Sequence, residues 1–91
     1  GITPVYAAPE TFDGIITRFC DQYSLACVYQ ELLTGVRPFD GSSMNQLLMQ
    51  HLNMPPNLNP SPPADRPALM KALSKRREDR RPSVSAFVRA L

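Results

Sequence analysis

The sequence has few of the residues on which most active sites depend. Its 91 residues include no tryptophan, one histidine, two cysteines and four glycines. A structural zinc site needs four ligands, and His51, Cys20 and Cys27 are too few to supply them. The two cysteines are seven residues apart, which on a helix is about 10.5 Å of rise and too far for a disulfide. Reduced thiols of this kind are typical of a cytoplasmic protein.

Several other signals of function are also missing. The sequence has no glycine-rich phosphate loop and no GxSxG, and its acidic pair Glu78-Asp79 lies among basic residues that compensate its charge. His51 lies on a polar stretch, so we expect a solvated or capping histidine. The net charge of +2 is too small to indicate a nucleic acid or an anionic membrane surface. No apolar run approaches the about 20 residues that cross a bilayer, which argues against a membrane segment.

The most prominent stretch is a predicted helix over residues 21–34. Its apolar residues, placed at about 100° per residue, cover nearly the whole circumference, which predicts a helix buried on all sides. Asp21 can cap its first amides, and Gly35 suits the left-handed position after its last turn. A chain of this length is at most one small domain that buries about 60–65% of its unfolded surface. We therefore expect the other elements to pack around this helix.

Three further helices are predicted, over residues 43–52, 64–74 and 83–91. Either Ser42 or Ser43 can cap the first of these helices, Ser83 can cap the last, and Pro67 fits the first turn of the middle one. The 3.6-residue period places these residues inward: Met44, Leu47, Leu48, Leu69, Met70, Leu73, Val84, Phe87, Val88 and Leu91. Five prolines in residues 53–63 exclude a regular element there. The prediction is an all-α chain with long loops and no strand.

Three ordered motifs point to a known family. They are residues 3–10 (TPVYAAPE), residues 21–25 (DQYSL) continuing to 31–39 (ELLTGVRPF), and residues 72–75 (ALSK) followed by 78–83 (EDRRPS). The triplet Ala8-Pro9-Glu10 matches a protein-kinase signature. Together the motifs resemble the C-terminal part of the large lobe of a serine/threonine protein kinase domain, most like the bacterial eukaryotic-type kinases. The resemblance covers residues 2–91 and implies that residues 1–91 are a partial kinase domain, a fragment of the all-α large lobe.

The resemblance implies roles for individual residues. Glu10 and Arg80 match a buried ion pair between the end of the activation segment and the loop before the last helix. Asp21 matches a buried aspartate that accepts hydrogen bonds from the catalytic loop. The segment Thr3, Pro4, Val5 and Tyr6 matches the loop that binds the substrate residue after the phosphorylated one, and Thr3 in particular favours serine/threonine over tyrosine kinases.

Plainer interpretations of the same residues stay open. The arginines around Arg80 can be solvated, Asp21 can be a simple N-cap, and Thr3 can be a turn residue before a proline. The sequence also departs from the family pattern at four positions, which are Ile2, Cys20, Ala26 and Arg77. Of these, Ile2 bears on the shape of the substrate loop.

The resemblance implies a parent enzyme that transfers the γ-phosphoryl group of ATP, with Mg²⁺, to protein serine or threonine. The groups that bind ATP and metal lie upstream in the family, in the small lobe and the catalytic loop. We therefore expect the 91-residue chain alone to bind no cofactor or metal and to be inactive, with a protein substrate and the rest of the kinase domain as partners. Two alternatives are a pseudokinase and a non-catalytic helical interaction module, and a third is an unrelated helical domain whose second helix binds a partner.

Overall fold

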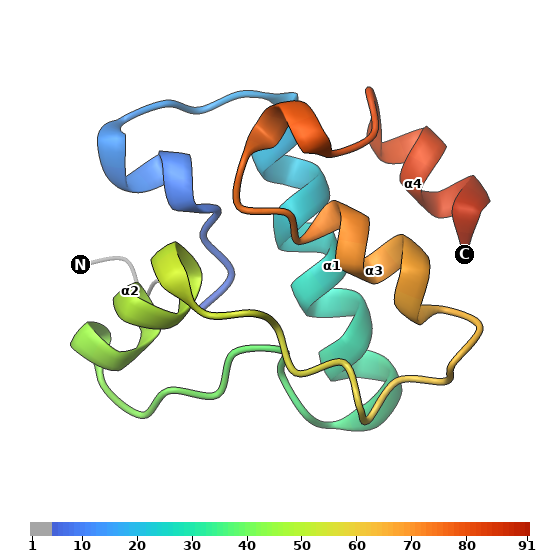
Figure 1. Ribbon diagram of the computed structural model, residues 1–91, viewed down its shortest axis with the longest axis horizontal. Helices are drawn as coiled ribbons and strands as arrows, with labels where there is room; N and C mark the ends of the chain where they lie inside the picture. Colours follow the sequence, from blue (N-terminus) through green and yellow to red (C-terminus); the bar gives the residue numbers. More distant parts are fainter. Residues whose placement is uncertain (1–4) are drawn as a thin grey trace.

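The computed structural model describes residues 5–91, and all regular secondary structure within them is helical, as predicted. The helices are α1 (Arg18–Thr34), α2 (Met44–Asn53), α3 (Arg66–Ala72) and α4 (Val84–Ala90). Two short 3-10 helices, η1 (Pro9–Asp13) and η2 (Arg77–Asp79), were not predicted. Helix α1 runs through the middle of the molecule, with α2 and η1 to one side and α3 and α4 to the other (Figure 1). No strand occurs in residues 5–91.

The helix ends follow the capping signals of the sequence, with one correction. Ser43 and Ser83 cap α2 and α4 through side-chain oxygens that accept from the backbone amide three residues later. Gly35 ends α1 with φ of 76°, a left-handed conformation that suits glycine. The predicted cap of α1 was wrong. The helix begins three residues earlier, and the Thr17 side chain accepts from the amide of Phe19 at 3.2 Å.

The predicted inward residues were partly right. Leu47, Leu69, Leu73 and Phe87 are buried, as their spacing indicated. The prediction was wrong for Met44, Met70 and Val88, because more than half of the surface of each side chain is exposed. Helices α2, α3 and α4 have only 10, 7 and 7 residues. Each covers its neighbours along a narrow stripe, so apolar residues next to that stripe project into solvent.

The core lies on one side of α1. Tyr23, Ala26 and Cys27 are buried there, and α1 contacts both α3 and α4. The ring of Phe39, from the loop after α1, stacks on Tyr23 with 6.2 Å between ring centroids. Helix α1 is also the longest helix, but no helix within residues 5–91 is long and apolar enough to span a membrane.

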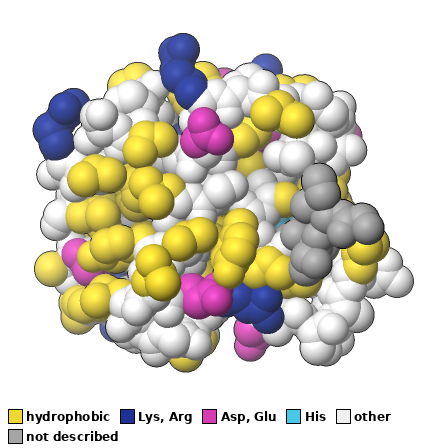
Figure 2. Space-filling view, turned by 180° about the vertical axis from the view of Figure 1, so that it is seen from behind, with side chains coloured by type: hydrophobic (Ala, Val, Ile, Leu, Met, Phe, Trp, Pro, Cys, Tyr) yellow, Lys and Arg dark blue, Asp and Glu magenta, His cyan; other side chains and the backbone are white. Residues whose placement is uncertain are grey.

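The other side of α1 contradicts the prediction of all-round burial. Leu32 is 83% exposed, and Leu25 and Leu33 are also exposed. Asp21 is exposed as well and lies four residues before Leu25, on the same stripe of the helix. The prediction was wrong because no described element covers this stripe. Hydrophobic side chains are spread over much of the face seen in Figure 2.

Candidate functional site

The segment before η1 is held by hydrogen bonds to two helices. The Ser24 hydroxyl donates to the carbonyl of Tyr6 at 2.7 Å, and the Tyr6 hydroxyl donates to Glu31 Oε2 at 2.7 Å. The carbonyl of Val5 is 3.1 Å from His51 Nε2 of α2. The described half of the predicted substrate loop is therefore fixed to the helices at consecutive residues. The other half, Thr3 and Pro4, lies outside the described residues.

His51 corrects the sequence interpretation, because it is completely buried rather than solvated. A carbonyl can only accept, so Nε2 donates to Val5, and in the neutral ring Nδ1 accepts from the Tyr23 hydroxyl at 2.7 Å. The His51 ring also packs against Phe39, 4.7 Å between centroids. Burial raises the pKa of Tyr23 well above its ordinary value, which keeps its hydroxyl protonated as a donor. Tyr23 thus helps to position Val5 through His51.

Glu10 and Arg80 are brought together, although 70 residues separate them in the sequence. Arg80 Nη1 and Nη2 donate to the two carboxylate oxygens of Glu10 at 2.6 and 2.9 Å, a bidentate pair. The guanidinium also donates to the carbonyls of Phe19 and Ser74 and lies 4.9 Å from the centre of the Tyr23 ring. The Arg80 side chain is fully buried. The ion pair joins η1, the start of α1 and the loop after α3.

The surroundings of Glu10 favour its charged form. Burial by itself would raise the pKa of Glu10, but the hydrogen bonds and positive charge of Arg80 outweigh it, and the pKa lies below its ordinary value. The Cys20 thiol contributes, since its Sγ donates to Glu10 Oε2 at 3.4 Å. Cys20, one of the departures from the family pattern, therefore belongs to the group that holds Glu10.

Two buried glutamines of α1 were missed by the sequence interpretation. Gln22 donates to the carbonyl of Arg81 at 2.8 Å and accepts from the Arg81 amide at 3.2 Å. Gln30 donates to the carbonyl of Asn57 at 2.8 Å and accepts from the Ser61 hydroxyl at 2.8 Å. They are eight residues apart, so they share a face of the helix. That spacing within an apolar helix was the available signal, and it shows that α1 fixes loops with polar groups as well as packing.

Asp21 is exposed at the surface, beside a hollow, rather than buried in the core. Its carboxylate makes no hydrogen bond to another residue in the range 5–91. It lines a hollow of about 320 Å³ whose walls are Tyr6, Ala7, Thr11, Ile16, Cys20, Asp21 and Ser24. The hollow thus joins the predicted substrate segment to the first turns of α1.

Metal-binding groups and the Cys27 thiol are further candidates for chemistry, and neither provides a reactive centre among the described residues. No group of three or more His, Cys, Asp or Glu side chains in residues 5–91 is placed to hold a metal ion. Both cysteines are free and buried. Burial raises the pKa of the Cys27 thiol to about 12, so the nucleophilic thiolate is scarce near neutral pH.

Comparison of sequences relates the chain to bacterial protein kinases, although no protein-family model matches it. It is 39% identical over 84 residues to the serine/threonine-protein kinase PknH of Mycobacterium tuberculosis, which covers 82% of this chain. It is 33% identical over 90 residues, 98% of the chain, to the serine/threonine-protein kinase PkaA of Streptomyces coelicolor. The tyrosine-protein kinase MasK of Myxococcus xanthus is 39% identical over 93 residues, which cover 96% of the chain. These matches span 13%, 17% and 14% of the relatives' own lengths.

Comparison of structures gives the same fold. The chain matches a crystal structure of the Rad53 kinase domain and SCD2 in complex with AMPPNP, with a TM-score of 0.79 at 23% identity, over 94% of this chain and 36% of that one. It matches a structure of titin kinase and its flanking domains with a TM-score of 0.82 at 21% identity, over 98% of this chain and 17% of that one. By sequence and by fold, the chain belongs to the protein kinase family and corresponds to the C-terminal part of the helical large lobe, with relatives among the bacterial serine/threonine kinases.

Proposed function

We propose that the chain is the substrate-facing and scaffolding part of a serine/threonine protein kinase, which transfers the γ-phosphoryl group of ATP to serine or threonine of a protein substrate. The observation that carries this proposal is the buried pair of Glu10 and Arg80. It ties the Ala8-Pro9-Glu10 triplet to the start of α1 and to the loop after α3. A tie of this strength at the end of a substrate loop serves to fix that loop relative to the lobe.

In this proposal residues 3–6 form the surface that receives the substrate peptide. Val5 and Tyr6 are held through their backbone carbonyls by His51 and Ser24, and the Tyr6 hydroxyl adds a hydrogen bond to Glu31. Accurate placement matters because a displacement of about 1 Å at a reacting group can lower a rate about 10²-fold. Thr3 is the residue that would approach the reacting groups of the upstream catalytic loop.

Asp21 has a supporting role in the same proposal. Its carboxylate is exposed beside a hollow of about 320 Å³ and has no partner in the part of the chain that the structure describes. Backbone amides of a catalytic loop would supply the missing donors, and the hollow would receive the loop. The exposed stripe of α1 beyond Asp21, which includes Leu25 and Leu32, would be covered by the same upstream part of the kinase domain.

ATP and Mg²⁺ are assigned to the upstream part of the parent and not to this chain. The described residues hold no group of metal-binding side chains, and no glycine-rich loop is present in the sequence. No step of phosphoryl transfer is therefore given to residues of this chain, and the chain alone is proposed to be inactive. A cytoplasmic location belongs to the proposal, with a protein substrate and the remainder of the kinase domain as partners.

The proposal is tested with the longer reading frame in which this chain is encoded. We expect purified parent protein to transfer ³²P from [γ-³²P]ATP to a protein substrate or to itself, and acid hydrolysis to yield phosphoserine or phosphothreonine. Recovery of phosphotyrosine alone would contradict the proposed specificity for serine and threonine. This outcome has to be tested because one relative, MasK, is a tyrosine-protein kinase. Absence of transfer from a folded parent would favour the pseudokinase alternative.

A matched pair of variants tests the role of Asp21. Asp21→Asn removes the charge that would accept the catalytic-loop amides, and we expect kcat to fall about 10²-fold while the parent remains folded. Asp13→Asn removes another exposed carboxylate, at the end of η1, and should leave kcat unchanged. Equal activity of the two variants would contradict the supporting role.

A further inference from the structure

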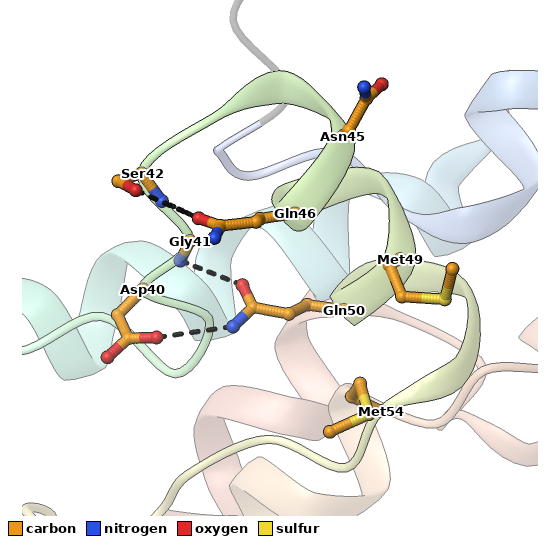
Figure 3. Close-up of a pocket in the computed structure, with 8 residues that line it drawn as sticks. All are labelled: Asp40, Gly41, Ser42, Asn45, Gln46, Met49, Gln50 and Met54. Atoms are coloured by element: carbon orange, nitrogen blue, oxygen red, sulfur yellow. Dashed lines mark hydrogen bonds between the residues drawn. The ribbon is translucent and has the colours of Figure 1, made fainter.

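A second hollow lies between the loop 40–42 and one side of α2. Its volume is about 510 Å³. Figure 3 shows that polar side chains line one end and two methionines the other. Neither the ion pair nor the substrate segment uses any of these residues.

The polar end is built by two glutamines one turn apart on α2. Gln46 Oε1 accepts from the amide and the hydroxyl of Ser42 at 2.8 and 2.9 Å. Gln50 Oε1 accepts from the Gly41 amide at 2.9 Å, and its nitrogen donates to Asp40 Oδ1 at 3.2 Å. These bonds are drawn in Figure 3. They fasten the loop to the helix, so the hollow exists before any ligand arrives and little ordering is required on binding.

Gly41 shows how closely the loop approaches the helix. A Cβ atom added to Gly41 would lie 2.9 Å from Gln50 Oε1 and 2.9 Å from the backbone nitrogen of Leu47. The backbone nitrogen cannot move aside, so only glycine fits. The close approach places the Asp40 carboxylate at the rim of the hollow, beside the glutamines.

The other end of the hollow is apolar and adaptable. Met49 and Met54 line it, and each is about half exposed. Methionine is unbranched and polarizable, and it adjusts to apolar groups of different shapes. This end therefore suits an aliphatic or aromatic side chain rather than one particular group.

The lining of the hollow contains one charged residue, and the Lys75 ammonium lies outside the lining, on the backbone carbonyl of Gln50. Asp40 is the single charged residue in its lining, and residues 38–64 contain no lysine or arginine, although the whole chain carries a net charge of +2. Asp40 uses Oδ1 on Gln50, and its second oxygen has no partner among residues 5–91. The side-chain nitrogen of Gln46 likewise donates to none of them. A ligand is thus offered a carboxylate, an amide donor and an apolar surface.

We propose that this hollow binds an extended segment of a partner protein in which a lysine or arginine lies two residues from a large apolar residue. In an extended chain, residues i and i+2 point to the same side and are about 7 Å apart. The basic side chain would reach Asp40, the apolar one would lie on Met49 and Met54, and a backbone carbonyl between them would accept from Gln46. This binding does not depend on the proposed phosphoryl transfer.

The test uses the four methionines of the chain as reporters. In the protein labelled with [methyl-¹³C]methionine, we add the peptide Ac-Ala-Arg-Ala-Leu-Ala-NH₂, its glutamate counterpart Ac-Ala-Glu-Ala-Leu-Ala-NH₂, and Ac-Ala-Arg-Ala-Gly-Ala-NH₂. The arginine–leucine peptide should shift the methyl signals of Met49 and Met54 and leave Met44 and Met70, which lie outside the lining, unchanged. It should bind about three- to fivefold more tightly than the glutamate peptide, the value of an exposed ion pair. The glycine peptide should shift neither signal.

A matched pair of variants decides whether Asp40 is responsible. Asp40→Asn keeps an oxygen that can accept from Gln50, so the loop stays in place, and the preference for arginine over glutamate should disappear. Asp13→Asn removes an exposed carboxylate elsewhere and should preserve that preference. Equal shifts with the arginine and glutamate peptides, shifts spread over all four methionines, or no shift at all would each overturn the proposal.

Discussion

The two sides of α1 differ in a way that composition does not reveal. The buried side carries two glutamines, Gln22 and Gln30, which are 0% exposed. The open side carries Leu25, Leu32 and Leu33, which are exposed. The helix therefore buries two polar residues beside Tyr23, Ala26 and Cys27, and it exposes three leucines, unlike an ordinary surface helix. The difference teaches that the buried side is completed by this chain, whereas the open side has no partner among residues 5–91.

The buried side is completed through specific polar contacts rather than through apolar area alone. Gln22 and Gln30 donate to backbone carbonyls of loop residues, which are not paired within a helix. Arg80 does the same for the carbonyls of Phe19 and Ser74. A buried polar group must be paired, so each contact specifies one arrangement of its loop. Substitutions on this side should therefore have large effects, and those on the open side small ones.

The largest effect is expected from Arg80→Met. The substitution keeps most of the apolar stem but leaves the Glu10 carboxylate buried without its cation, which costs about 3–5 kcal/mol of unfolding free energy. Urea unfolding followed by circular dichroism measures the loss. Arg76→Met is the matched control, because Arg76 and Glu78 form an exposed pair at 3.7 Å. Its loss should be within about 0.5 kcal/mol, and equal losses in the two variants would contradict the role of the buried pair.

The next effect is expected from Gln30→Met, which has similar length and no hydrogen-bonding group. It leaves the Ser61 hydroxyl and the Asn57 carbonyl without their partner inside the protein, at about 2–3 kcal/mol. The same urea titration measures it. Hydrogen exchange should locate the change, with faster exchange in residues 57–61 than in α4. A loss below about 0.5 kcal/mol would mean that packing alone holds this loop.

Lys75 adds a pH-dependent effect on the buried side. Its Nζ donates to the carbonyl of Gln50 at 2.9 Å and lies 4.3 Å from the centre of the Phe39 ring. Burial lowers the pKa of Lys75 from 10.5 to about 8. Because the folded pKa is depressed, the stabilising contribution is complete above pH 10.5 and is lost as the pH falls through 8. Lys75 is only partly buried, so solvent screening reduces the expected change to about 1 kcal/mol.

The measurement compares the wild type with Lys75→Met across pH 7 to 10. The wild type should gain unfolding free energy relative to the variant as the pH rises. Cys27 titrates above about pH 9 in the unfolded state of both proteins, so its effect cancels in the difference. Lys71→Met removes the same charge from an exposed position of α3 and serves as the control. A difference that stays constant with pH, after this control is subtracted, would contradict the depressed pKa.

The sequence predicted the order and type of the helices because local signals specify them. Ser43, Ser83 and Gly35 marked ends that the structure has, and the kinase-like motifs placed Glu10 and Arg80 among the candidate residues. It failed where the answer depends on contacts distant in sequence. The burial of His51 requires Tyr23 and Val5 together, and the burial of Gln30 requires Asn57 and Ser61. The apolar pattern around α1 predicted that both sides of the helix are buried. It did not predict that residues 5–91 cover only one of those sides.

The smallest effect is expected on the open side, from Leu32→Ser. Leu32 is 83% exposed, so the substitution removes few contacts and should change the unfolding free energy of the 91-residue chain by no more than about 0.5 kcal/mol. Leu69→Ser, at a buried position of α3, is the contrast and should cost several-fold more unfolding free energy.

If a longer kinase chain covers the exposed stripe of α1, the same Leu32→Ser change there would cost about 2 kcal/mol, because a buried leucine would then become a buried hydroxyl. A loss of that size already in the 91-residue chain would instead mean that copies of the chain cover the stripe, which sedimentation at several concentrations would detect. The difference between the two chains therefore measures directly how far the open side of α1 is completed from outside.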